Sequence, residues 1–148
     1  MKFFLLVSLL LFPALTGGCQ KPPGELATVP MKIGNQKFDV EIAATPESQE
    51  TGLMKRDGMP ADHGMIFVFP QEEVRQFWMK NTRFPLDIVF LNSGGAVVSI
   101  RHMVAYDESL TSSNSPARYA IELNNGAAES AGLKVGDVLA IPEQAKSR

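Results

Sequence analysis

Short segments that alternate apolar and polar residues recur along this chain, and turn-forming residues separate them. Residues 37–42 place phenylalanine, valine and isoleucine on one face, which is the pattern of a half-buried β-strand. Residues 29–33 are expected to pair with that strand across the turn at residues 34–35. Residues 118–123 repeat the alternation. The chain is therefore predicted to fold mainly as β-structure.

The other predicted strands are short apolar runs bounded by turn residues. They cover residues 64–69, 74–80, 86–91, 96–101 and 138–141. Pro70 is expected to end the first of these runs, because proline cannot donate to a sheet ladder. Residues 92–95 form a hairpin turn, and the Ser-rich segment 106–117 is predicted to be a loop.

Two short helices are predicted. Thr45 has the position of an N-cap before a proline and an acidic residue, so a helix is expected over residues 46–54. A second helix should be capped by Asn124 or Asn125 and run to residue 131, with Gly132 just beyond its end. Many strands with only two brief helices favour a β-sandwich or barrel over a parallel α/β sheet.

The beginning of the chain has the features of an export signal. Lys2 precedes an apolar stretch, residues 3–15, which is shorter than the roughly 20 residues needed to cross a bilayer. Small residues then precede Cys19, an arrangement similar to the bacterial lipobox, although Thr16 stands where that box usually has leucine. We therefore predict that residues 1–18 are a lipoprotein signal peptide and that Cys19 carries the lipid.

Cys19 is the only cysteine, so it has no disulfide partner within the chain. An ordinary secretory peptide that ends near a cysteine is the alternative interpretation. Residues 19–30 contain prolines and a glycine and are predicted to be a tether of up to roughly 30 Å. By similarity to Gram-negative lipoproteins, Gln20 after the cysteine favours the outer membrane, facing the periplasm, if the host has one.

Composition excludes several classes of function. Without the signal, roughly 130 residues are left, which is a usual size for one domain. The net charge of −2 offers no basic surface for nucleic acid. His63 and His102 are the only histidines, too few with a lipidated cysteine for a structural zinc site. No cofactor or metal is predicted. A copper(I) role for the methionine-rich domain is a minor alternative.

Four central blocks carry a family resemblance. They are Gly52-Leu53-Met54-Lys55-Arg56, residues 64–69, Trp78-Met79-Lys80-Asn81-Thr82 and residues 85–90. Together with residues 121–126 and 136–137, they resemble the DUF192 (UPF0127) family in order, from about residue 31 to 142. The resemblance implies a domain over 31–142, with a tail at 143–148, and a mostly β, jelly-roll-like sandwich. It implies no activity, because the family has none established.

Trp78 and Met79 cannot both enter one core. If residues 74–81 form a strand, these two side chains point to opposite faces, and a sandwich buries only one face of a strand fully. The other side chain is either covered by the loop at residues 52–63 or lines an apolar groove, where tryptophan would offer a flat face and an N–H donor.

Asp87 is expected on the apolar side of a strand, where a carboxylate needs a cation or hydrogen-bond donors. Candidate cations are Arg56, Arg83 and Arg101. Asp87 is interpreted either as part of a structural salt bridge or as an acid/base group beside a substrate-binding Arg56. Glu122 could be a second carboxylate, although its alternation predicts an outward side chain that is solvated or bridging.

Asn81 and Thr82 precede a turn and are expected either to shape it or to contact a ligand. The predicted binding patch consists of Arg56, Trp78, Met79, Asn81, Thr82 and Asp87. The first hypothesis is a non-enzymatic envelope module that binds a glycan or a partner protein. The alternatives are an enzyme that acts on envelope glycan through Asp87, and perhaps Glu122, and a purely structural lipoprotein.

Overall fold

The computed structural model describes residues 26–146 of the chain. The strands are β1 (Thr28–Ile33), β2 (Gln36–Ala43), β3 (His63–Phe77), β4 (Leu86–Leu91), β5 (Val97–Met103) and β6 (Thr111–Asn124). The helices are α1 (Pro46–Thr51), α2 (Ala127–Ser130) and α3 (Glu143–Lys146). The predicted mostly-β fold is thus confirmed, with a third short helix added at the C-terminal end.

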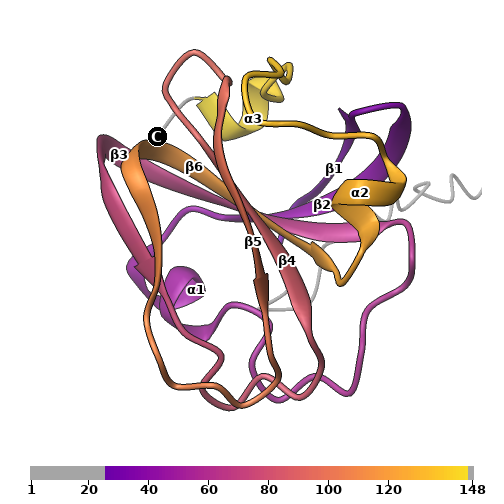
Figure 1. The fold of residues 1–148 in the computed structure, drawn as a ribbon, viewed down its shortest axis with the longest axis vertical. Coiled ribbons are helices and arrows are strands. Elements are labelled where there is room, and N and C mark those ends of the chain that lie inside the picture. Colours follow the sequence, from indigo (N-terminus) through magenta and orange to yellow (C-terminus); the bar gives the residue numbers. More distant parts are fainter. Residues whose placement is uncertain (1–25, 147–148) are drawn as a thin grey trace, which may run out of the picture.

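The strands form one six-stranded sheet in the order β1-β2-β3-β6-β4-β5. All neighbouring strands are antiparallel except β2 and β3, which are parallel. The sheet is strongly twisted and does not close into a barrel (Figure 1). Helices α2 and α3 lie on one side of it and α1 on the other (Figure 1).

Both faces of the sheet bury apolar side chains. The first core lies under α2 and α3 and contains Val40, Ile66, Val89 and Ile121. The second core lies on the opposite face and contains Met65, Phe67, Ile88 and Phe90. Strand β4 is covered on both sides, because all six of its residues are buried. This double coverage explains why its sequence is almost continuously apolar.

The predicted hairpin between β1 and β2 is confirmed. Gly34 in its turn has φ +57°, and a Cβ atom there would lie 2.1 Å from the carbonyl oxygen of Ala131, so glycine is required. Helix α1 also begins as predicted, with a capping box between Thr45 and Ser48. It ends at Thr51, earlier than predicted, because Gly52 leaves the helical conformation at φ +46°.

Strand β3 corrects two predictions. Pro70 does not end the strand, and residues 74–80 are not a separate strand, since β3 continues from His63 to Phe77. Its pairing with β6 is irregular between Val68 and Glu73. Pro70 lies in this irregular stretch, where the strand needs no ladder donor. Because β3 ends at Phe77, Trp78 and Met79 follow the strand.

Strand β6 corrects the predicted loop at 106–117, since the strand begins at Thr111. Its first half is irregular and partly held by side chains. The Arg75 backbone N–H donates to Ser113 Oγ over 2.9 Å, and Ser113 Oγ donates to the Ser115 carbonyl over 2.6 Å. Serine and asparagine therefore serve a bulged strand here, although they are also typical of loops.

The C-terminal part corrects two more predictions. Residues 138–141 do not form a strand, and only an isolated bridge pairs Val138 with Ala96. The N-cap of α2 is Gly126, which makes no side-chain cap, and not Asn124 or Asn125. Gly132 follows the helix at φ +67°, as predicted.

Candidate functional site

Trp78, the only tryptophan of the chain, lies between two surface openings. One opening, of about 270 Å³, lies between α1 and the end of β3 and includes Phe69, Val74 and Arg75. The other, of about 320 Å³, includes Lys55, Lys80 and Asn81. We call the two openings together the Trp78 groove. The Trp78 side chain is 41% exposed, so its ring is accessible to a ligand.

Met79 points the other way. It is buried in the second core, which also contains Leu53 from the loop after α1. Its backbone N–H donates to the carbonyl of Asp107 over 2.7 Å. The loop that contains Leu53 therefore covers Met79, whereas Trp78 lines the groove. Loop cover and a position in a groove were predicted as alternatives, and each applies to one of these two residues.

Asn81 and Thr82 shape the turn below the groove. Asn81 adopts φ +57°, and its carbonyl accepts a hydrogen bond of 2.9 Å from the Lys55 N–H. Thr82 is buried, and its carbonyl accepts a bond of 3.0 Å from the Tyr106 N–H. These contacts favour the turn-making interpretation, and only Asn81 reaches the groove.

The groove combines aromatic surface with charge. Lys80 Nζ lies 4.9 Å from the centre of the Trp78 ring. In the other opening, the Arg75 guanidinium lies 4.1 Å from the centre of the Phe69 ring. Both are cation–π contacts. Glu50 of α1 lines both openings. The Arg75 side chain is already bonded to the carbonyls of Gln71 and Ala117 and lies 3.4 Å from Glu73, so a ligand on the flat face of Trp78 would meet the charge of Lys80.

Asp87 is not part of this groove. It is fully buried on the sheet face covered by α2. Its Oδ1 lies 2.6 Å from His102 Nδ1, and its Oδ2 accepts a bond of 3.0 Å from the Ala128 N–H. None of the predicted arginine partners is used. His102, whose side chain is 66% exposed, was not predicted as a partner.

Glu122 is buried, and the predicted outward position is wrong. It lies 5% exposed in the second core, in register with Met65 and Ile88. Alternation placed it opposite Ile121 correctly, but that opposite face is itself covered. Burial raises the pKa of Glu122 to about 8, although the nearby charge of Arg56 opposes the shift.

Arg56 lines neither opening of the groove and lies near Glu122 of the second core. It binds Glu41 of β2 through two hydrogen bonds, of 2.5 and 2.8 Å. The bonds to Glu41 raise the pKa of Arg56 further, so the guanidinium stays charged. This bidentate pair ties the loop after α1 to the sheet.

The two candidate acid/base carboxylates cannot share one cleft. Asp87 pairs with Leu123 and Ile88 pairs with Glu122 on the neighbouring strands β4 and β6. Residues one step apart in a strand point to opposite faces. The sheet therefore separates Asp87 from Glu122, whereas the two carboxyl groups of a glycosidase flank one substrate.

Within 26–146, no three or more histidine, cysteine, aspartate and glutamate side chains come together in a way that could hold a metal ion. None of the helices in this part of the chain has the length and apolar character needed to cross a membrane. Cys19 lies outside the described residues.

The match to a protein family settles the relationship that the motifs suggested. The family model for DUF192, described as an uncharacterized ACR, matches residues 29–141. The chain belongs to the DUF192 family. A search of curated proteins finds no match to this chain.

Two solved structures are similar to this DUF192 chain. One is a protein of Sinorhizobium meliloti 1021, provisionally described as a transcription regulator, with 35% identity and a TM-score of 0.73 over 78% of this chain and 95% of that one. The other is a protein of unknown function from Novosphingobium aromaticivorans DSM 12444. It is 34% identical, with a TM-score of 0.76 over 82% of this chain and 90% of that one.

Proposed function

We propose that this DUF192 protein is an exported lipoprotein whose domain binds a ligand or partner protein through the Trp78 groove, without catalysing a reaction. The observation that carries the proposal is the accessible Trp78 ring between two openings. A large flat aromatic surface with a polar N–H contributes strongly to binding at small cost in conformational entropy.

The chemistry around Trp78 indicates the kind of ligand. A sugar ring or an apolar side chain can lie against the indole, while Lys80 can bind an anionic group beside it. An envelope glycan or an extended segment of an envelope protein fits this description. Arg56, Met79, Thr82 and Asp87 take no part in this proposed site, because each has a structural contact elsewhere.

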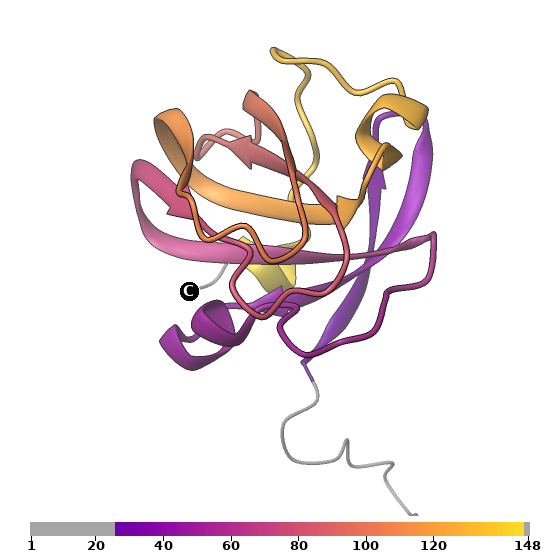
Figure 2. The same cartoon turned by 60° about the horizontal axis from the view of Figure 1, so that its bottom comes forward.

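The lipoprotein part of the proposal rests on the sequence before the domain. Leu26, where the described chain begins, lines an opening with Gly52 and Arg56 beside α1. Figure 2 shows the start of the described ribbon and α1 at the same end of the molecule. A tether from Cys19 would therefore place the domain with this end towards an outer membrane, on its periplasmic side if the host is Gram-negative.

The binding proposal is tested with the fluorescence of Trp78, which no other tryptophan obscures. Soluble fragments of envelope glycan and tryptophan-free peptides of envelope proteins are titrated against the chain. We expect one of them to change the emission, and Trp78→Ala to lose the binding when it is followed by calorimetry. Val104→Ala, an exposed apolar residue outside the groove, is the matched control. Binding that survives Trp78→Ala would contradict the site.

The anchor is tested separately. Cells that express the chain are labelled with a radioactive fatty acid, and their membranes are fractionated. We expect label in the wild-type protein and none in Cys19→Ala, which should also leave the membrane fraction. An unlabelled wild-type protein would favour the ordinary secretory signal.

A further inference from the structure

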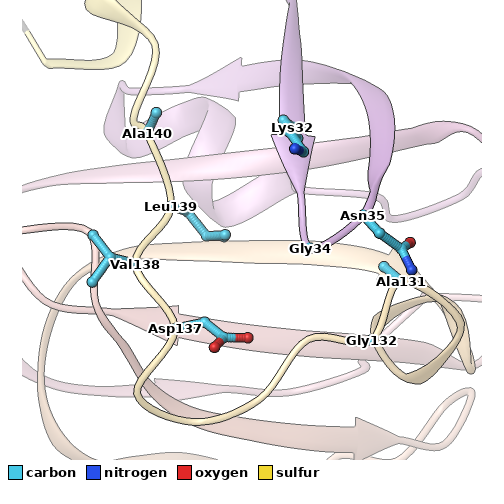
Figure 3. A pocket seen from close by; sticks show the side chains of 9 residues that line it. All are labelled: Lys32, Gly34, Asn35, Ala131, Gly132, Asp137, Val138, Leu139 and Ala140. Atoms are coloured by element: carbon cyan, nitrogen blue, oxygen red, sulfur yellow. The ribbon is translucent and has the colours of Figure 1, made fainter.

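A second pocket lies away from the Trp78 groove and shares no lining residue with it. It has a volume of about 540 Å³, within the range of small-molecule sites. Its walls are the β1–β2 turn, the end of α2 and the extended segment 137–140, which we call the strap (Figure 3). We call this opening the strap pocket.

The walls of the strap pocket are held by backbone contacts. The Asn35 N–H donates to the Ala131 carbonyl over 2.9 Å, which fixes the turn against the end of α2. On the other side, the Val97 N–H donates to the Asp137 carbonyl over 2.8 Å, and the Leu139 N–H donates to Gly95 over 2.9 Å. The backbone of the pocket walls is therefore held in place, while the charged side chains of Lys32 and Asp137 are exposed at its edges.

Opposite charges lie on opposite walls. Figure 3 shows Lys32 on the β1 side and Asp137 on the strap, with the Leu139 side chain between them. Lys32 is exposed between the buried residues Met31 and Ile33, so its side chain points outward from β1. Within residues 26–146, no carboxylate pairs with its amine. Asp137 Oδ2 accepts a hydrogen bond of 2.8 Å from the Lys134 N–H, which leaves its other oxygen for a ligand.

We infer that the strap pocket binds a small zwitterion, either a free amino acid or a short peptide with both ends free. Its ammonium group contacts Asp137, its carboxylate contacts Lys32, and an apolar side chain lies over Leu139. A dipolar ligand matches this arrangement, because it can contact both charged walls at once whereas a ligand with one charge contacts only one of them. This site is independent of the proposed role of Trp78.

The ligand class is tested by calorimetry on the protein as purified from its expressing cells, in detergent micelles. The probes are alanine, dialanine, N-acetyl-dialanine and dialanine amide. We expect alanine or dialanine to bind, and each capped dipeptide to bind at least tenfold more weakly than dialanine. Binding of alanine alone identifies the free amino acid as the source, and tighter binding of dialanine identifies the peptide. The inference is overturned if neither alanine nor dialanine binds, or if the capped dipeptides bind as tightly as dialanine.

Variants test the two walls. Lys32→Ala should weaken the binding of the uncapped probe at least tenfold. Lys37→Ala should leave that binding unchanged, because Lys37 faces Lys32 in the hairpin register but does not line the pocket. Asp137→Asn keeps an acceptor for Lys134 and should also weaken binding tenfold. The reversed pair K32D/D137K should restore binding relative to K32D, because a zwitterion can turn around. Unchanged binding in Lys32→Ala would overturn the site, and Trp78→Ala should have no effect on it.

Discussion

Asp87 and Glu122 lie on neighbouring strands, one register step apart, yet the sheet places them in opposite environments. Asp87, under α2, is fully buried and accepts hydrogen bonds from a backbone N–H and an imidazole. Glu122, on the other face, is also buried, but its main electrostatic relief is the charge of Arg56. Burial alone therefore does not decide the free-energy cost of placing a carboxylate in the core, because hydrogen-bond donors offset that cost.

Replacing Asp87, the carboxylate that accepts two hydrogen bonds, should have the largest effect on stability. Asp87→Ala leaves the buried Ala128 N–H without an acceptor and removes the side-chain bond between β4 and α2. We expect a loss of about 4 kcal/mol in the free energy of unfolding, measured by urea denaturation. Asp87→Asn, which can still accept one bond, should lose less. A loss below about 1 kcal/mol for Asp87→Ala would contradict the structural role given to its hydrogen bonds.

Glu122 should make stability depend on pH in the opposite direction from an ordinary ion-paired carboxylate. Its folded pKa of about 8 lies above the unfolded value of 4.5, so the folded state holds a proton that the unfolded state releases. Stability should therefore fall as the pH rises from 4.5 to 8, by up to about 4 kcal/mol. Glu122→Gln should flatten this slope in urea denaturation at several pH values. An unchanged slope in the variant would contradict the assignment.

His102 tests whether the second donor to Asp87 matters as much as the backbone N–H. Because its side chain is 66% exposed, we expect His102→Ala to cost only about 1–2 kcal/mol. His102→Gln, which keeps a side-chain donor, should recover part of this loss in thermal denaturation. Arg101→Ala on the same strand is the matched control, since its side chain is exposed and bonds the carbonyl of its neighbour Ile100.

The Arg56–Glu41 pair should have the smallest effect. The Arg56 side chain is partly exposed, so solvent screens the interaction. We expect Arg56→Lys to cost less than about 1 kcal/mol, because the charge is kept and only the bidentate geometry is lost. A double-mutant cycle with Glu41→Gln measures the coupling. A coupling well above 1 kcal/mol would show that this pair is better shielded than its exposure indicates.

Local sequence patterns predicted much of the sheet. The β1–β2 hairpin, β4, the start of α1 and the glycine after α2 all follow from alternation, capping residues or positive φ angles. The errors at β3 and β6 share one cause. Proline and serine are typical of loops, but a bulged pair of strands tolerates them where side chains replace ladder bonds. Such bulges depend on the partner strand, which a local pattern does not include.

The positions of the candidate site residues were likewise predicted only in part. Trp78 and Met79 were predicted to point in different directions, and they do, although they follow a strand and are not part of one. His102 was missed because the β4–β5 pairing shifts between Phe90 and Leu91. The hairpin turn alone would not place His102 opposite Asp87. The signal that a partner existed was the carboxylate itself, since a buried charge requires one.

The sequence by itself determined that the domain is mostly β, that Asp87 needs donors and that Trp78 and Met79 must separate, because these follow from local periodicity and from the cost of burying charge. Only the tertiary structure decided which donors Asp87 receives, that Glu122 is buried and that Trp78 lines a groove. These outcomes depend on strand register and on distant segments that cover both faces of the sheet.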